Sequence, residues 1–292
     1  MSIPTRFGAK NGVNVADSRR RPGMPVRRTS CAPEASCSLP IRKRISRTPL
    51  GQRTLEQTGS SSLSKTATPT ENSTYEVEAR TRHQHNELVN SVTHGIGAIL
   101  AVIGFFALLE RTNSDTMKTI AFVLYGGTMI VLYLASTALH SYHIPSRTRR
   151  ILRRLDHVAI YLYIAGTHTP LCLITLGDQY GWALLGTVWT LAGAGVLFKL
   201  FYLDASRWLS MATYLATGWI AVLLLWPLSQ VMPGEAIFWL VLGGFFYTVG
   251  SMIYLLRRPN PWPGKFAHHE IWHCAVLAGS ACHYYMMLEF VA

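Results

Sequence analysis

One stretch of the sequence decides the fold. Residues 118–140 read K-T-I-A-F-V-L-Y-G-G-T-M-I-V-L-Y-L-A-S-T-A-L-H, and Lys118 at the start is the only Lys, Arg, Asp or Glu in them. A helix needs about 20 mostly apolar residues to cross a hydrocarbon core about 30 Å thick. The stretch is therefore predicted to be a membrane-spanning helix, and it ends with a serine and a histidine one helical turn apart.

Six other stretches have the same character. The chain is 49% hydrophobic and only 14% charged, a composition that suits an all-α integral membrane protein. The segments between the stretches contain strong helix breakers such as Gly177-Asp178 and Pro233-Gly234. We predict a bundle of seven transmembrane helices, with spans near residues 91–110, 118–140, 155–176, 181–203, 209–229, 236–256 and 269–290.

The first 82 residues differ from the rest of the chain. Residues 1–82 carry 15 of the 27 Lys and Arg residues but 6 of the 15 acidic residues, and they are rich in Ser, Thr and Pro. Such a segment has too little apolar area to offset the entropy lost on ordering. We expect a disordered basic tail over 1–82 and one membrane domain over 83–292. The tail suits a cytoplasmic segment near anionic lipid, with an organellar transit peptide as the alternative.

The orientation follows from the basic loops. The loop 141–154 holds five arginines and the loop 257–268 holds three basic residues, whereas 177–181 and 230–235 hold none. Basic loops stay on the cytoplasmic side of a membrane, and those of this chain fall on the side of the tail. We therefore expect a cytoplasmic N-terminus, a C-terminus outside, and residence in the plasma membrane.

Several ionisable residues fall at the cytoplasmic ends of the predicted spans. Ser136 and His140 close the second span, Asp156 opens the third, and His269 and His273 open the seventh. Polar groups at membrane depth are costly and mark functional sites. If these spans are neighbours, the five side chains lie at one depth.

The spacing of these residues favours a metal site. His269 and His273 are four residues apart, so they project from one face of a helix and can chelate one ion. His140 would complete the three imidazoles typical of catalytic zinc, which keeps a fourth position open. Asp156 could then hold or orient the water at that position.

Other readings of the histidines are simpler. A lone histidine at a helix end is usually an interfacial polar residue, and we assign His83, His85, His143, His157 and His268 to that class. The string His-Glu-x-x-His also occurs in soluble zinc proteases, where its glutamate is the general base. No soluble catalytic domain is evident here, so we expect Glu270 to pair with a base such as Lys265 or to support a ligand.

Five motifs together carry a resemblance to a known family. They are E-L-V-N-S-V-T-H-G-I-G (87–97), S-T-A-L-H-S (136–141), R-R-L-D-H (153–157), A-G-T-H-T-P (165–170) and H-E-I-W-H…A-G-S-A-C-H (269–283). In this order they resemble the hemolysin III family, which is grouped with the progestin and adipoQ receptors, including the adiponectin receptors. The likeness covers about residues 83–292.

The resemblance implies seven transmembrane helices, a cytoplasmic N-terminus and a zinc ion near the cytoplasmic face. The three zinc-ligand histidines of the adiponectin receptors match His140, His269 and His273. The aspartate that holds their zinc-bound water matches Asp156, and Ser136 matches the serine of the second-span motif. The superfamily includes alkaline ceramidases, which makes ceramide the candidate substrate.

The same resemblance extends to three residues before the first span and departs at one other position. Glu87, Asn90 and His94 match a signature of the bacterial members, and we expect them to support the site. Bacterial relatives often carry Tyr where this chain has His168. Twelve residues of helix separate His168 from Asp156, about 18 Å, so we do not expect His168 to be a fourth ligand.

Our first expectation is a zinc-dependent hydrolase of lipid amide bonds, with Asp156 and Ser136 in the chemistry. The first alternative is a membrane receptor or regulator with a structural zinc, which would need closed four-ligand coordination. The second is a hemolysin-type pore, which would need a polar stripe across the whole bilayer. We expect the lipid bilayer as the surroundings and no nucleic-acid partner.

Overall fold

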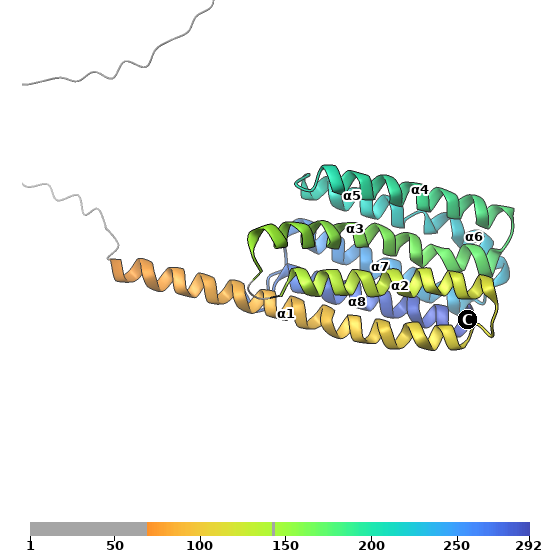
Figure 1. Ribbon diagram of the computed structural model, residues 1–292, viewed down its shortest axis with the longest axis horizontal. Coiled ribbons are helices and arrows are strands. Elements are labelled where there is room, and N and C mark those ends of the chain that lie inside the picture. The colour runs from red at the N-terminus through yellow and green to blue at the C-terminus, as the bar shows by residue number, and fades with distance from the viewer. Residues whose placement is uncertain (1–68, 142–143) are drawn as a thin grey trace, which may run out of the picture. The chain divides into compact units, whose positions relative to one another are not determined.

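The structure, a computed structural model, describes residues 69–141 and 144–292. It is all-helical, as predicted (Figure 1). The elements in chain order are α1 (Pro69–Glu110), α2 (Thr116–Leu139), α3 (Ser146–Pro170), η1 (Leu171–Leu176), α4 (Gln179–Phe201), α5 (Arg207–Gly218), α6 (Ala221–Val231), α7 (Gly234–Leu256) and α8 (His268–Phe290).

Within the described residues, six helical segments are long and apolar enough to cross a membrane. They are Gln84–Glu110, Thr116–Leu139, Ser146–Leu176, Gln179–Phe201, Arg207–Val231 and Gly234–Leu256. The predicted seventh span corresponds to α8, which has 23 residues and is therefore about 35 Å long. It falls outside the six because Glu270 and its histidines make it less apolar. The count of seven stays a prediction.

The helix α1 is longer than the predicted first span. It begins at Pro69 and has 42 residues, so the last part of the expected tail, 69–82, is helical. Proline suits the first position of a helix, where a backbone N–H would have no intrahelical partner. Low apolar content argues against a packed core, but it does not prevent a helix. The rest of the predicted tail, 1–68, lies outside the described residues.

The predicted fifth span, 209–229, is divided into α5 and α6. The division follows Gly218, a residue with low helix propensity. Pro227 lies inside α6 and has no N–H to offer the Leu223 carbonyl four residues earlier. The Tyr180 hydroxyl donates a hydrogen bond of 2.9 Å to that carbonyl instead. A residue of α4 therefore satisfies the group that the proline leaves open.

The predicted break at Gly177-Asp178 is confirmed. Gly177 ends η1 with a φ of 59°, a left-handed conformation that glycine adopts without a steric penalty. Asp178 then caps α4, and its side chain accepts a hydrogen bond of 2.8 Å from the Gly181 N–H. The chain reverses here from the third predicted span into the fourth.

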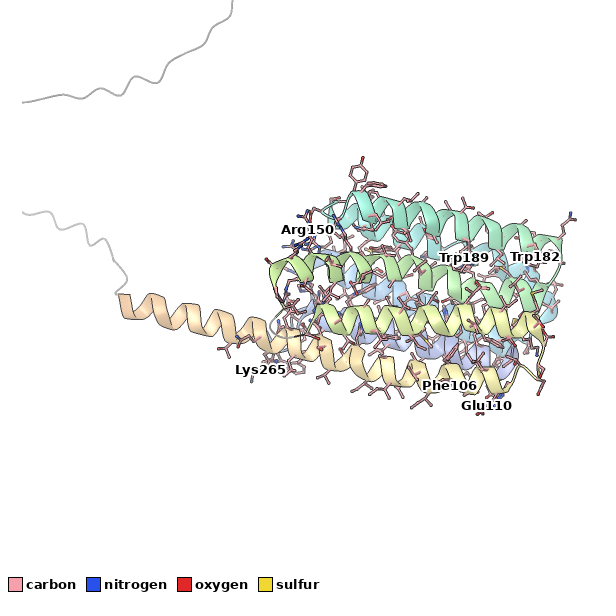
Figure 2. All side chains as sticks on the ribbon, viewed as in Figure 1. Phe106, Glu110, Arg150, Trp182, Trp189 and Lys265 are labelled. Carbon is pink, nitrogen blue, oxygen red and sulfur yellow. The ribbon has the colours of Figure 1, made fainter. Side chains whose placement is uncertain are left out.

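The packing brings distant residues to one end of the bundle. The helix α2 packs against α1 and α3, and α8 packs against α7 and α1. The end of α2 therefore lies near the beginnings of α3 and α8 (Figure 1). Arg150 and Lys265 lie at this same end, and Glu110 and Trp182 lie at the opposite one (Figure 2). The histidines of α2 and α8 and the basic loops thus share one end.

Candidate metal centre

Three histidines from two helices form a compact triangle at this end. His140 follows the last residue of α2, and its N–H bonds to the Ser136 carbonyl. His269 and His273 lie in the first two turns of α8. The ring centroids are 5.1 Å apart for His140 and His269, 5.0 Å for His140 and His273, and 4.8 Å for His269 and His273. The spacing prediction thus places the right residues together.

The triangle can hold one metal ion. Each histidine offers one ring nitrogen, and the three nitrogens lie within 4.8 Å of one another. The Nε2 atoms of His269 and His273 are 3.1 Å apart, close enough to share either a proton or an ion. His140 and His273 are buried, so bulk water does not solvate these nitrogens freely. A bound cation would replace the missing solvation.

Glu87 sets the orientation of the His140 ring. Its carboxylate lies 2.8 Å from His140 Nδ1 and 3.5 Å from Arg149 Nη1. A carboxylate accepts the Nδ1–H of a neutral imidazole and thereby leaves Nε2 with its lone pair, ready for a metal. The helix α1 therefore contributes to the centre although it provides none of the three histidines.

The Glu270 side chain fixes the start of α8. It is 1% exposed, and its oxygens accept hydrogen bonds from the Asn90 side chain at 3.0 Å and from the Ala267 N–H at 2.8 Å. A pairing with Lys265 is not seen in the described part of the chain. Asn90 thus ties α1 to the turn of helix that carries His269. Glu270 supports a ligand helix, one of the two roles considered from the sequence.

His94 covers one face of the centre. Its ring stacks on that of His273 with centroids 3.7 Å apart and meets Tyr133 edge to face at 5.1 Å. Stacking of this kind restricts the rotation of the His273 ring. All three residues of the signature before the first span therefore touch the centre or its supports, since Glu87 bonds His140 and Asn90 bonds Glu270.

Asp156 and Ser136 border the same cavity as the three histidines. The Asp156 carboxylate interacts with the Ser136 hydroxyl and with the His140 ring. It is not a member of the group whose atoms could share one ion, which among the described residues consists of the three histidines. The carboxylate borders the cavity from the side of α3.

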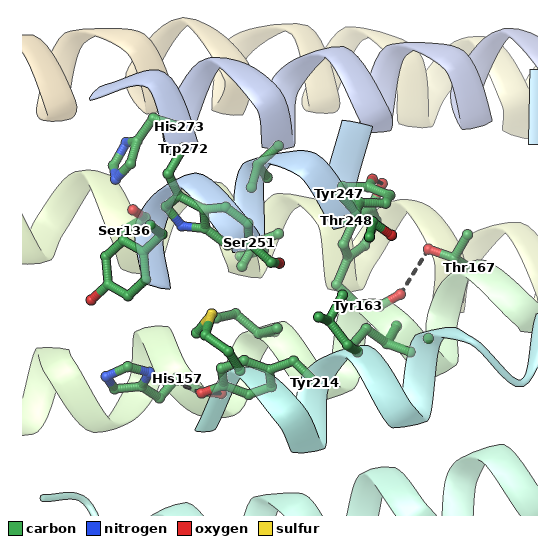
Figure 3. A pocket seen from close by; sticks show the side chains of 18 of the residues that line it. Ser136, His157, Tyr163, Thr167, Tyr214, Tyr247, Thr248, Ser251, Trp272 and His273 are labelled. Atoms are coloured by element: carbon green, nitrogen blue, oxygen red, sulfur yellow. Dashed lines mark hydrogen bonds between the residues drawn. The ribbon is translucent and has the colours of Figure 1, made fainter. Parts of the chain in front are cut away.

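The cavity is large and runs from the centre into the bundle. It has a volume of about 1230 Å³ and is bordered by residues of α1, α2, α3, η1, α5, α6, α7 and α8. Ser136 and His273 lie at one end, and Tyr163, Thr167 and Tyr247 lie farther along (Figure 3). The lining also includes Arg149, Arg150 and Arg153. It can take a long apolar molecule with a polar or anionic end beside the histidines.

His157, His168 and His268 are not members of the group of three histidines that could hold an ion. His157 Nδ1 is 2.9 Å from the Tyr214 hydroxyl, and His268 bonds to Asn260. His168 hydrogen-bonds its own helix, at the Ile164 carbonyl. As expected, His168 is therefore separate from the three ligands. The side chains of His83 and His143 lie outside the described residues.

Comparisons with known proteins agree with this arrangement. A family model described as "Haemolysin-III related" matches residues 82–284. "Hemolysin-3" of Bacillus cereus is 38% identical over 213 residues, which cover 72% of this chain and 94% of the relative. "Hemolysin-3 homolog" of Bacillus subtilis is 37% identical over 206 residues, covering 70% and 93%.

More distant relatives support the wider superfamily. "Monocyte to macrophage differentiation factor" of Homo sapiens is 25% identical over 215 residues, 71% of this chain and 85% of the relative. The family match extends across the candidate membrane spans and the histidine triangle. The chain is therefore an integral membrane protein that belongs to the hemolysin III family.

Proposed function

We propose that this protein is a zinc-dependent hydrolase that cleaves the amide bond of a membrane lipid such as ceramide. The observation that carries the proposal is the histidine triangle, which lies at the end of a long cavity beside Asp156 and Ser136. A metal-capable group, a carboxylate and space for an acyl chain are the parts that such a reaction needs.

The donor set suits zinc. Zinc–nitrogen bonds of about 2.0–2.1 Å place two ligand nitrogens of a tetrahedral site roughly 3.3 Å apart. The Nε2 atoms of His269 and His273 are 3.1 Å apart, which is close to that separation. Three neutral imidazoles are a common protein ligand set for catalytic zinc. Among the described residues the group has three members, which favours an open fourth position over a closed structural site.

The chemistry divides between the ion and the side chains. When bound here, zinc would supply Lewis acidity and make a coordinated water more acidic. Asp156 would accept a proton from the attacking water on its carboxylate and return it to the leaving nitrogen. Ser136 would orient that carboxylate, and Glu87 would hold His140 through Nδ1. The surrounding helices exclude bulk water, which strengthens each polar contact.

The surroundings of the site fit the same proposal. We infer that the end with the basic loops faces the cytoplasm, that α8 is a seventh span, and that the protein resides in the plasma membrane with its C-terminus outside. A lipid could then enter the cavity sideways from the inner leaflet. Labelling of an Arg150→Cys variant by an impermeant thiol reagent added outside intact cells would contradict this orientation.

The test is hydrolysis by the purified, zinc-loaded full chain in lipid vesicles containing ceramide. We expect release of the fatty acid, and we expect Asp156→Asn to lower the rate by at least about 100-fold while zinc stays bound. Asp115→Asn is a matched control, because asparagine also caps a helix and Asp115 caps α2 at the far end. No release by zinc-loaded wild type, or equal rates in both variants, would refute the hydrolase.

A further inference from the structure

Four polar side chains border the cavity well inside the bundle. We call them the acceptor belt: Thr167 and His168 of α3, Thr248 of α7 and His283 of α8. They come from three helices and border one continuous cavity. His168 is 5% and His283 is 7% exposed. Neither the histidine triangle nor the proposed proton transfer uses them.

Each side chain of the belt gives its hydrogen to a backbone carbonyl. Thr167 donates to Tyr163 and Thr248 donates to Gly244, both at 2.8 Å. His168 Nδ1 lies 2.8 Å from the Ile164 carbonyl, and His283 Nε2 lies 3.1 Å from the Leu240 carbonyl. A carbonyl can only accept, so in a neutral ring those two nitrogens carry the hydrogen.

The belt is therefore left with lone pairs alone. The remaining nitrogens, His168 Nε2 and His283 Nδ1, are buried and have no hydrogen-bond partner in the described part of the chain. A buried polar atom without a partner is costly and calls for an explanation. Because the four side chains of the belt have no hydrogen left to donate, they would repel a carbonyl or carboxylate oxygen. They would favour a neutral hydroxyl or amide N–H.

The belt lies at a defined distance from the metal centre. His283 follows His273 by ten residues on the same helix, which is about 15 Å. Tyr163 and Tyr247 stand beside it, with their hydroxyls 3.3 Å apart (Figure 3). The His283 ring lies so close to Gly243 that a Cβ there would be 2.2 Å from His283 Cδ2. The packing thus holds this ring in place.

We propose that the acceptor belt binds a hydroxyl group carried on the acyl chain of the ligand, beyond the middle of that chain. The direction of the chain rests on the proposed function, which places the carbonyl end at the histidine triangle. If the ligand is a free fatty acid, the arginines beside the triangle would bind its carboxylate, and its acyl chain would run in the same direction. The protein would then prefer lipids whose acyl chain is hydroxylated far from the amide.

The test measures binding to the detergent-purified full chain. The probes are octadecanoic acid and a series of hydroxyoctadecanoic acids that differ only in the position of the hydroxyl. We expect isomers with the hydroxyl beyond mid-chain to bind about tenfold more tightly than octadecanoic acid. Thr248→Val and His283→Leu should each lower this preference, the ratio of the two affinities, at least threefold.

Two further variants separate recognition from folding. His283→Asn keeps an acceptor near the position of Nδ1 and should retain the preference. Thr190→Val is the matched control, because Thr190 makes the same bond to its own helix, to the Gly186 carbonyl at 2.7 Å, but is exposed on α4. It should bind every acid as wild type does.

Three results would overturn the proposal: no binding of any acid, no preference among them, or a preference that persists in both Thr248→Val and His283→Leu. The outcome is independent of turnover, because binding of the acids needs no hydrolysis and the preference should persist in Asp156→Asn. A protein that shows the preference but cleaves no lipid amide would refute the hydrolase and leave the belt standing.

Discussion

Glu87 lies outside the histidine triangle but orients one of its rings. Its carboxylate accepts the Nδ1–H of His140 and also contacts Arg149. We expect Glu87→Gln to weaken zinc binding about 10- to 100-fold, because the ring loses the charge that orients it and increases its basicity. Zinc affinity is measured by competition with a chelator of known strength.

The matched control is Glu110→Gln, which makes the same chemical change at an exposed position at the other end of α1. This variant should bind zinc as wild type does. Equal zinc affinity in Glu87→Gln and Glu110→Gln would mean that His140 does not depend on Glu87.

At this scale the sequence predicted which histidines lie together better than it predicted the residues that support them. The four-residue spacing of His269 and His273 fixes their common face in any helix, and they do lie together with His140. Glu87 lies 53 residues from His140, so no spacing rule connects them. The resemblance placed Glu87 near the site, but its partner emerges only from the packing of α1 on α2.

At the scale of elements, α2 and α3 must approach closely to place Ser136, His140 and Asp156 on one cavity. Gly166 permits this approach, because a Cβ there would lie 2.1 Å from Thr128 Oγ1 and 3.0 Å from the Leu124 carbonyl. We expect Gly166→Ala to lower the free energy of unfolding in detergent by about 1–3 kcal/mol through overpacking. Denaturant unfolding of the purified protein measures this change.

Gly127→Ala provides the comparison within α2, since a Cβ at Gly127 would meet nothing within 4 Å. It should be neutral or slightly stabilising, by up to about 1 kcal/mol, because alanine favours the helix. If Gly166→Ala were as stable as Gly127→Ala, the contact between α2 and α3 would not be as tight as described.

Helix positions were predictable where apolar length decides them, and less so where local chemistry intervenes. The break at Gly177-Asp178 follows from glycine geometry and an N-cap. The division between α5 and α6 was missed, because the length of 209–229 suits one continuous span and a single glycine such as Gly218 does not by itself end a helix. Pro227 inside α6 is tolerated because the Tyr180 hydroxyl of α4 donates a hydrogen bond to the Leu223 carbonyl, which the proline leaves without a partner. A contact between two helices cannot be predicted from the residue pattern of one of them.

At the scale of the whole molecule, the fold joins one polar end to an apolar interior. The basic loops, the histidine triangle and Asp156 share that end, and the cavity extends from it towards the acceptor belt. Charge asymmetry along the chain predicted the shared end, because short loops alternate sides in a bundle of spans. The cavity could not be predicted, since it depends on how the helices are spaced.

The central claim is that His140, His269 and His273 hold zinc, and the metal content of the full chain tests it most directly. Elemental mass spectrometry of freshly purified, folded protein should find near one zinc per chain in wild type. It should find almost none in His140→Ala and His273→Ala, and a wild-type amount in His85→Ala, whose side chain is exposed on α1. Folded wild-type protein without zinc, or zinc that persists in the two ligand variants, would contradict the account.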